Sequence, residues 1–289
     1  MVTSGMRVLK RRKSNADYFY LQHSFRTGRI VKTKEKYLGK RIPVDIPVLM
    51  ERLRDECNRE GLFVLFEKIR TGFQREWKRY PKGMQEKIKR QLAVDFTYNT
   101  NAIEGSTISW EETRGIVEDR VSPQRPLGDV KETEAHVRVF LAMIEEPQVL
   151  DKGLILGWHK ELFRETKADL AGKFREYLVR VGRYRAPDWQ DVDHLMKELV
   201  LFFNQSTRMN PVELAARVHY RFEKIHPFGD GNGRVGRLLM NFILWCTGYP
   251  ILIIEYKKRS SYYRALGKDE DHFFQYFSRR YLRAYRRFL

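Results

Sequence analysis

The sequence predicts a mainly α-helical protein that carries two small β-hairpins. Apolar residues recur at helical spacing through most of the chain after residue 46, whereas alternating aromatic and β-branched residues occur in only two short stretches. An apolar share of 42% and a length of 289 residues are sufficient for a packed core. We expect three parts: residues 1–45, 46–145 and 146–289.

Residues 1–45 are predicted to form a small basic β-element. In residues 17–39, aromatic and β-branched runs lie on either side of Thr27 and Gly28, which is typical of a hairpin. Residues 1–45 contain 12 Lys and Arg but only 3 Asp and Glu, so they carry +9 of the net charge of +18. This segment could follow a nucleic-acid backbone, although an ordinary solvated surface explains the same pattern.

Residues 46–145 are predicted to be helical, after a linker bracketed by Pro43 and Pro47. The helical spacing begins with four apolar residues, Leu62, Leu65, Phe66 and Ile69. One helix is expected to end at Gly105, and the next to begin at Ser109, which forms a capping box with Glu112. Residues 123–129, PQRPLGD, are predicted to be a loop.

Residues 146–289 contain the second hairpin and the C-terminal helix. The alternation of Tyr177, Val179 and Val181 indicates a hairpin, since glycine and proline nearby interrupt any helical period. The segment 273–289 is predicted to be an amphipathic helix with a basic polar face, which could also face a partner subunit.

Two amphipathic helices flank a short loop in this third part. Their apolar faces consist of Leu214, Val218, Phe222 and Ile225 in the first helix, and of Val235, Leu238, Leu239 and Phe242 in the second. The loop, HPFGDGNGR, has glycines at 229, 231 and 233, which could take positive φ and point successive N–H groups at one anion. The start of the second helix adds its dipole, and Arg234 and Arg237 add two guanidinium groups. The sequence therefore predicts a triphosphate site.

The same loop carries a candidate metal ligand and a candidate base. Asp230 offers hard oxygen atoms beside the phosphate site, which suits Mg²⁺. A neutral His226 could accept a proton from an attacking hydroxyl group. A dinucleotide fingerprint, G-x-G-x-x-G, also matches residues 231–236, but a charged helical segment precedes it where that fingerprint requires a buried strand.

HPFGDGNGRVGR, residues 226–237, resembles the signature of Fic proteins, H-P-F-x-[DE]-G-N-G-R-x-x-R, at every fixed position. The resemblance covers roughly residues 90–285 and implies a helical bundle with a β-hairpin flap that transfers AMP to protein hydroxyl groups. It implies that His226 is the base and that Asp230 holds Mg²⁺. It implies nucleotide binding by the next residues of the motif: Gly231, Asn232, Gly233, Arg234 and Arg237.

Outside this motif, the resemblance implies further roles. The hairpin residues Gly182, Arg183 and Tyr184, together with Tyr262, are similar to the flap and adenosine-side positions. Residues 100–105, TNAIEG, resemble the inhibitory helix motif of the family, [ST]-x-x-x-E-[GN], with Glu104 as the inhibitory carboxylate.

We therefore expect a protein adenylyltransferase that uses ATP and Mg²⁺ and that Glu104 restrains. Two alternatives stay open: an enzyme that removes AMP with the same site, and a nucleic-acid-binding regulator with a secondary Fic domain. The partner is a target protein, which could be the chain itself, and a homodimer is also open. Two unpaired cysteines and no uninterrupted apolar span indicate a cytoplasmic location and no membrane insertion.

Overall fold

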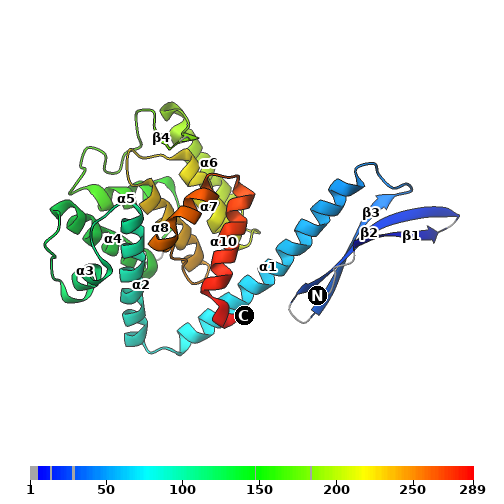
Figure 1. Ribbon diagram of the computed structural model, residues 1–289, viewed down its shortest axis with the longest axis horizontal. Coiled ribbons are helices and arrows are strands. Elements are labelled where there is room, and N and C mark those ends of the chain that lie inside the picture. The colour runs from blue at the N-terminus through cyan, green and yellow to red at the C-terminus, as the bar shows by residue number, and fades with distance from the viewer. Residues whose placement is uncertain (1–5, 14, 28–29, 147, 183) are drawn as a thin grey trace. The chain divides into compact units, whose positions relative to one another are not determined.

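The computed structural model describes residues 6–13, 15–27, 30–146, 148–182 and 184–289 (Figure 1). The chain divides into two compact units, one comprising residues up to 71 with 287–289 and the other residues 72–286. Helix α1 (Ile46–Arg79) begins in the first unit and ends in the second. The mainly helical fold is confirmed, whereas the division into three parts at residues 45 and 145 stays a prediction.

The first unit contains an antiparallel sheet in the order β1 (Met6–Lys13), β2 (Ala16–Thr27) and β3 (Ile30–Gly39). Strands β2 and β3 are the predicted hairpin, whose residue Gly28 lies outside the described residues. Strand β1 was not predicted, because five of its eight residues are Lys or Arg and no apolar alternation marks it. Its pairing with β2 supplies the backbone hydrogen bonds that its own sequence does not suggest.

One face of this sheet packs on α1. The cluster is formed by Leu21 and Phe25 of the sheet and by Leu53 and Cys57 of the helix. Pro47, expected in a linker, instead lies in the first turn of α1, where proline is tolerated because the N–H it lacks has no intrahelical partner.

The second unit is built from helices. In chain order they are α2 (Lys82–Ile103), α3 (Trp110–Arg114), α4 (Leu127–Glu145), α5 (Lys152–Phe163), α6 (Val192–Gln205), α7 (Pro211–Ile225), α8 (Asn232–Cys246), α9 (Arg259–Leu266) and α10 (Glu270–Ala284). Shorter helical turns lie at Gly115–Asp119, Trp189–Asp191, Tyr256–Lys258 and Arg286–Phe288. No helix of the described chain has both the length and the hydrophobicity to cross a bilayer.

Helix α8 forms the centre of this unit. It contacts α7, α2, α4 and α5, and it is buried along nearly its whole length. A helix that is buried on all sides must be enclosed by others, and every residue of α8 from Arg234 to Leu244 is buried. The N-terminus of α8 is therefore held in a fixed position by the surrounding bundle.

Three predicted boundaries near the site differ in outcome. The capping box of Ser109 and Glu112 is confirmed at the start of α3, and α2 ends at Ile103, just before Gly105. The loop predicted at residues 123–129 was too long, because α4 already begins at Leu127. Gly128 can continue a helix there, and Asp129 favours the first turn through the helix dipole.

The predicted second hairpin is present but short. It pairs β4 (Arg180–Val181) with β5 (Tyr184–Arg185), and Gly182 has a φ of +58° in the turn. Tyr177 and Val179 lie before it in irregular structure, where the buried Arg175 donates hydrogen bonds to the carbonyls of Tyr177 and Pro187. Arg183 lies outside the described residues.

Candidate functional site at the start of helix α8

The predicted loop joins α7 to α8 through two residues in left-handed conformation. His226 has a φ of +51° and ends α7, with its N–H donating to the carbonyl of Phe222 at 2.9 Å. Gly231 has a φ of +79° and precedes α8. A residue other than glycine rarely adopts positive φ, so surrounding contacts must hold His226 in place.

Asn232 closes the loop from inside. Its Oδ1 accepts from the N–H of Phe228 and its Nδ2 donates to the carbonyl of the same residue, both at 2.8 Å. The Arg175 Nε atom donates to the carbonyl of His226 at 2.8 Å. These buried hydrogen bonds hold the backbone of the loop in one conformation.

The three loop glycines differ in backbone conformation and in the groups that approach them. Of the three, only Gly231 adopts the positive φ that each of them could take. At Gly233, a Cβ atom would lie 2.2 Å from Oε1 of Glu104, and at Gly229 it would lie 2.2 Å from the Tyr177 hydroxyl. Both atoms are at the ends of flexible side chains, so another residue at either position would require these side chains to move.

His226 faces a cavity of about 310 Å³ that separates the hairpin from α9. Its lining includes Gly182, Tyr184 and Tyr263. Burial lowers the pKa of His226 and the nearby Arg175 lowers it further, while the Glu223 carbonyl favours the protonated ring. The buried Nδ1 atom of His226 nevertheless has no hydrogen-bond partner among the described residues, so its contact with the Glu223 carbonyl lacks the geometry of an ordinary hydrogen bond. The imidazole is therefore neutral at pH 7, as a base must be.

Tyr262, predicted on the adenosine side, lies in the core instead of the cavity. Its hydroxyl group is 2.8 Å from Nε2 of His219, whose Nδ1 lies 2.8 Å from the Gly236 carbonyl. Its neighbour Tyr263 lines the cavity and reaches the carbonyl of Ile103 at 3.5 Å. The Tyr184 hydroxyl donates to the Lys224 carbonyl at 2.8 Å, which ties the hairpin to α7.

Arg237 is buried beside the end of α2. Its side chain is 1% exposed, and its Nη2 lies 2.6 Å from Oε1 of Glu104 and 3.2 Å from the carbonyl of Thr100. The Glu104 side chain is 27% exposed. The predicted inhibitory carboxylate and the predicted phosphate-binding arginine thus form a charge-assisted pair.

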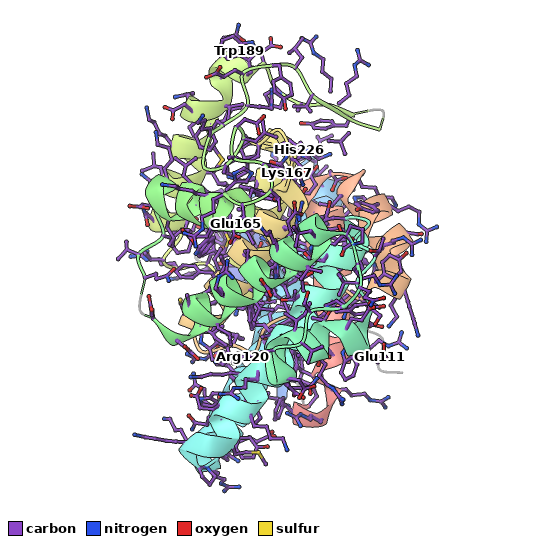
Figure 2. The ribbon with its side chains drawn as sticks, turned by 90° about the vertical axis from the view of Figure 1, so that its left-hand side faces the viewer. Glu111, Arg120, Glu165, Lys167, Trp189 and His226 are labelled. Carbon is purple, nitrogen blue, oxygen red and sulfur yellow. The ribbon has the colours of Figure 1, made fainter. Side chains whose placement is uncertain are left out.

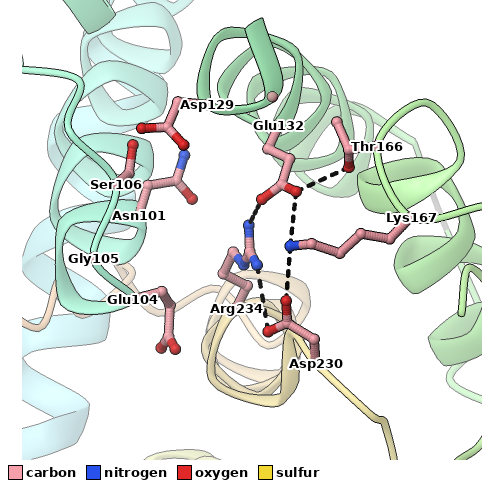
Figure 3. Close-up of a pocket in the computed structure, with 11 residues that line it drawn as sticks. Asn101, Glu104, Gly105, Ser106, Asp129, Glu132, Thr166, Lys167, Asp230 and Arg234 are labelled. Carbon is pink, nitrogen blue, oxygen red and sulfur yellow. Dashed lines mark hydrogen bonds and ion pairs between the residues drawn. The ribbon is translucent and has the colours of Figure 1, made fainter. Parts of the chain in front are cut away.

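A second ionic cluster surrounds Asp230 (Figure 3). The Lys167 ammonium group lies 2.7 Å from Oδ2 of Asp230 and 2.9 Å from Oε1 of Glu132, and Glu132 also pairs with Arg234. Burial opposes ionisation of Asp230, yet Lys167 and Arg234 keep its pKa below the ordinary value. These groups line a polar cavity of about 360 Å³ that Glu104 and Asp129 also reach.

Glu132 and Lys167 were not identified as site residues from the sequence. They lie about a hundred and about sixty residues before the loop and belong to no motif. Figure 2 labels Lys167 and His226, which project near each other in that view. Within the described residues, no three His, Cys, Asp or Glu side chains converge as a metal cage would require.

The family model described as the Fic/DOC family matches residues 149–244. The chain is 34% identical over 192 residues to a protein adenylyltransferase Fic of Drosophila ananassae, and 33% identical over 196 residues to one of Drosophila melanogaster. These matches cover 62% and 64% of the chain. The chain spans 37% and 39% of the length of these two relatives.

Two solved structures share the fold. Fic-1 from C. elegans superposes with a TM-score of 0.68 and 26% sequence identity, over 84% of this chain and 76% of that one. A Fic domain containing signaling protein from Bacteroides thetaiotaomicron has a TM-score of 0.67 and 24% identity, over 75% of this chain and 95% of that one.

Proposed function

Residues 149–244 belong to the Fic/DOC family, and from this premise we propose that the chain transfers AMP from ATP to a hydroxyl group of a protein. The observation that supports it most is that one loop borders two cavities of different character. The cavity at His226 has aromatic and aliphatic walls, whereas the cavity at Asp230 is lined mostly by charged and polar groups. ATP has the same division, with an aromatic base at one end and a triphosphate at the other.

In this proposal the triphosphate lies against the N-terminus of α8. The free N–H groups of that first turn and the dipole of the helix favour negative charge, and Arg234 and Arg237 supply two guanidinium groups. The adenosine lies between Tyr184 and Tyr263, in the cavity that His226 faces. In this proposal Tyr263 has the adenosine-side role that was predicted for Tyr262.

In the proposed transfer step, the neutral imidazole of His226 acts as the base. A hydroxyl group of the target gives its proton to His226, and its oxygen forms a bond to the α-phosphorus of ATP. The bond from the α-phosphorus to the bridging oxygen breaks, and pyrophosphate leaves. General-base catalysis of this kind contributes about 10²- to 10⁴-fold in rate.

The donor atoms at Asp230 fit Mg²⁺. The side chain is 44% exposed and presents a carboxylate beside the polar cavity. Mg²⁺ in nucleotide sites commonly binds one or two carboxylates, substrate phosphates and several waters, so a larger protein cage is not needed. When bound, Mg²⁺ would neutralise phosphate charge and orient the triphosphate. Lys167 would then have to release the Asp230 oxygen that it holds at 2.7 Å.

Glu104 is proposed to restrain this reaction. Its carboxylate holds Arg237 and lies against Gly233, so it takes up space at the start of α8 where outer phosphates would bind. ATP could then bind only weakly or with its α-phosphorus out of line, and small displacements of a reacting atom reduce rates strongly. The proposed target is a protein, and this chain could itself be that target. A homodimer remains a separate proposal.

The proposal is tested by incubating the protein and its Glu104→Gly variant with Mg²⁺ and ATP that is labelled at the α-phosphate. We expect label on protein, and a mass increase equal to AMP. Protein that gains the mass of a phosphate and carries no α-label would indicate phosphorylation and would contradict the proposal. The same samples, tested with an AMP-modified protein and no ATP, would reveal removal of AMP instead.

A further inference from the structure

The sheet of the first unit has one covered face and one open face. Side chains of alternate residues in a strand point to opposite faces. Leu21, His23 and Phe25 of β2 point toward α1 and are buried. The open face is defined by residues in the alternate positions: Arg7, Leu9, Arg11 and Lys13 of β1, Tyr18, Tyr20, Gln22 and Ser24 of β2, and Thr33, Glu35 and Tyr37 of β3.

Polar side chains on the open face form a ladder across all three strands. Nε of Arg7 donates to Oε1 of Gln22 at 2.7 Å, and Nε2 of Gln22 donates to Oε1 of Glu35 at 2.7 Å. Arg11 donates to the same Glu35 oxygen at 2.8 Å. This ladder holds two guanidinium groups in place over the sheet, so that less side-chain entropy is lost when they bind an anion.

Aromatic side chains lie beside the ladder. The ring centroid of Tyr37 is 5.2 Å from that of Tyr20 and 6.3 Å from that of Tyr18. The Arg11 guanidinium lies 4.7 Å from the centroid of the Tyr20 ring. Tyr37 is 53% exposed, although a tyrosine that served only the core would be covered.

From this face we propose that the first unit binds single-stranded nucleic acid. Three basic residues and one acidic residue lie on it, within a segment whose net charge is +9. Phosphates would pair with Arg7, Arg11 and Lys13, and unpaired bases would stack on the exposed tyrosine. Basic groups that track the backbone, interleaved with aromatic rings, are the combination that binds single strands without strong sequence preference.

Other occupants fit this face less well. The major groove of duplex DNA is about 12 Å wide and admits a helix or a two-stranded ribbon, whereas this face has three strands with side chains across all of them. An acidic protein could form ion pairs with the basic residues, but such binding would not explain why aromatic rings are exposed beside an arginine. The proposal is independent of AMP transfer, because none of its residues lies in residues 149–244.

The test uses the full chain and labelled poly(U) and poly(dT) of about 20 nucleotides, a length that spans common single-strand sites. Fluorescence anisotropy is measured from about 50 to about 200 mM salt, with a duplex of the same length as competitor. We expect binding to single strands that weakens steeply as salt rises. Tyr37→Ala should weaken binding about 5-fold or more, the loss expected for one stacked base.

Arg7→Gln with Lys13→Gln is the second variant, and it should lower the slope of log affinity against log salt by about 1.4. Its matched control, Lys78→Gln with Arg79→Gln, removes the same charge from exposed positions at the end of α1 and should leave the slope unchanged. Circular dichroism checks that each variant is folded. Absence of binding at low salt, tighter binding to the duplex, or equal binding by the parent and both open-face variants would each overturn the proposal.

Discussion

His226 combines an unusual backbone conformation with a ring that is neutral at pH 7. Its positive φ turns the chain at the end of α7, and its carbonyl is held by Arg175. Nδ1 of the ring has no hydrogen-bond partner within the described structure, while burial and Arg175 keep the pKa of the ring below its ordinary value. Contacts to the backbone thus hold the loop, and the side chain is available for chemistry.

Replacing this ring tests its role directly. His226→Ala should reduce AMP transfer by about 10²- to 10⁴-fold, because the general base is lost. Calorimetry should find ATP affinity almost unchanged, because the ring is proposed to act on the target hydroxyl and not on the nucleotide. His194→Ala, at an exposed position of α6, is the matched control and should behave like the parent. Equal rates for both variants would reassign His226 to a structural role.

Asp230 is the residue on which metal dependence should rest. Asp230→Asn keeps the size of the side chain but removes the charge that favours a hard cation. We expect ATP binding by the variant to differ little between Mg²⁺ and a chelator, whereas the parent binds more tightly with Mg²⁺. Glu165→Gln, which neutralises an exposed carboxylate that also pairs with basic groups, should retain the parent's dependence. A variant with an unchanged Mg²⁺ requirement would move the metal ligand elsewhere.

Helix α7 carries a buried carboxylate next to the site. Glu223 is 11% exposed, and its Oε1 has no hydrogen-bond partner among the described groups. Burial raises the pKa of Glu223 to about 7, while Arg237 acts in the opposite direction. The folded protein therefore holds this proton more tightly than the unfolded chain, whose ordinary value is 4.5.

The stability that α7 derives from protonated Glu223 should depend on pH. It is complete below pH 4.5 and is lost as the pH rises through about 7. Glu223→Gln should therefore match the parent in acid but be more stable at about pH 8, by up to roughly 3 kcal/mol. Urea unfolding at both pH values measures it, with Glu111→Gln at an exposed position as control. A stability difference that does not change with pH would show that the fold does not raise the pKa of Glu223.

The elements that could be predicted from the sequence are those with local signals. Helices α7 and α8, the loop between them and the capping box at Ser109 follow from periodicity, glycines and side-chain caps within a few residues. Strand β1 could not be predicted, because its charged sequence carries no strand pattern and its extended backbone depends on pairing with β2. The second hairpin was predicted from its alternation, but not that Tyr177 and Val179 lie outside it, beside Arg175, which donates hydrogen bonds to carbonyls of distant segments.

The same distinction holds within the site. The motif residues could be named because they are contiguous, and Glu104, which pairs with Arg237 in the structure, was named through a second short motif. Glu132 and Lys167 could not be named, since only packing of α4 and the segment after α5 against the loop brings them there. Tyr262 and Tyr263 are adjacent in sequence, and only burial against His219 distinguishes the core residue from the one at the cavity.

The protein combines two units, for which separate roles are proposed. The helical unit carries the proposed AMP transfer and its restraint, and the basic sheet carries the proposed binding of nucleic acid. The restraint links segments more than a hundred residues apart, because the end of α2 supplies the carboxylate and α8 supplies the arginine. Breaking that one contact therefore tests the arrangement of the helical unit as well as the function.

The central measurement compares AMP incorporation by the parent, by Glu104→Gly, and by Glu104→Gly combined with His226→Ala. Removing the carboxylate frees Arg237 for the phosphates, so the single variant should be faster than the parent, and the double variant should lose that gain. Glycine near a helix end costs about 1 kcal/mol, and loss of a partner of the buried Arg237 adds to it. The rates are therefore compared well below the unfolding temperature of each variant. A folded Glu104→Gly protein no faster than the parent would contradict the account.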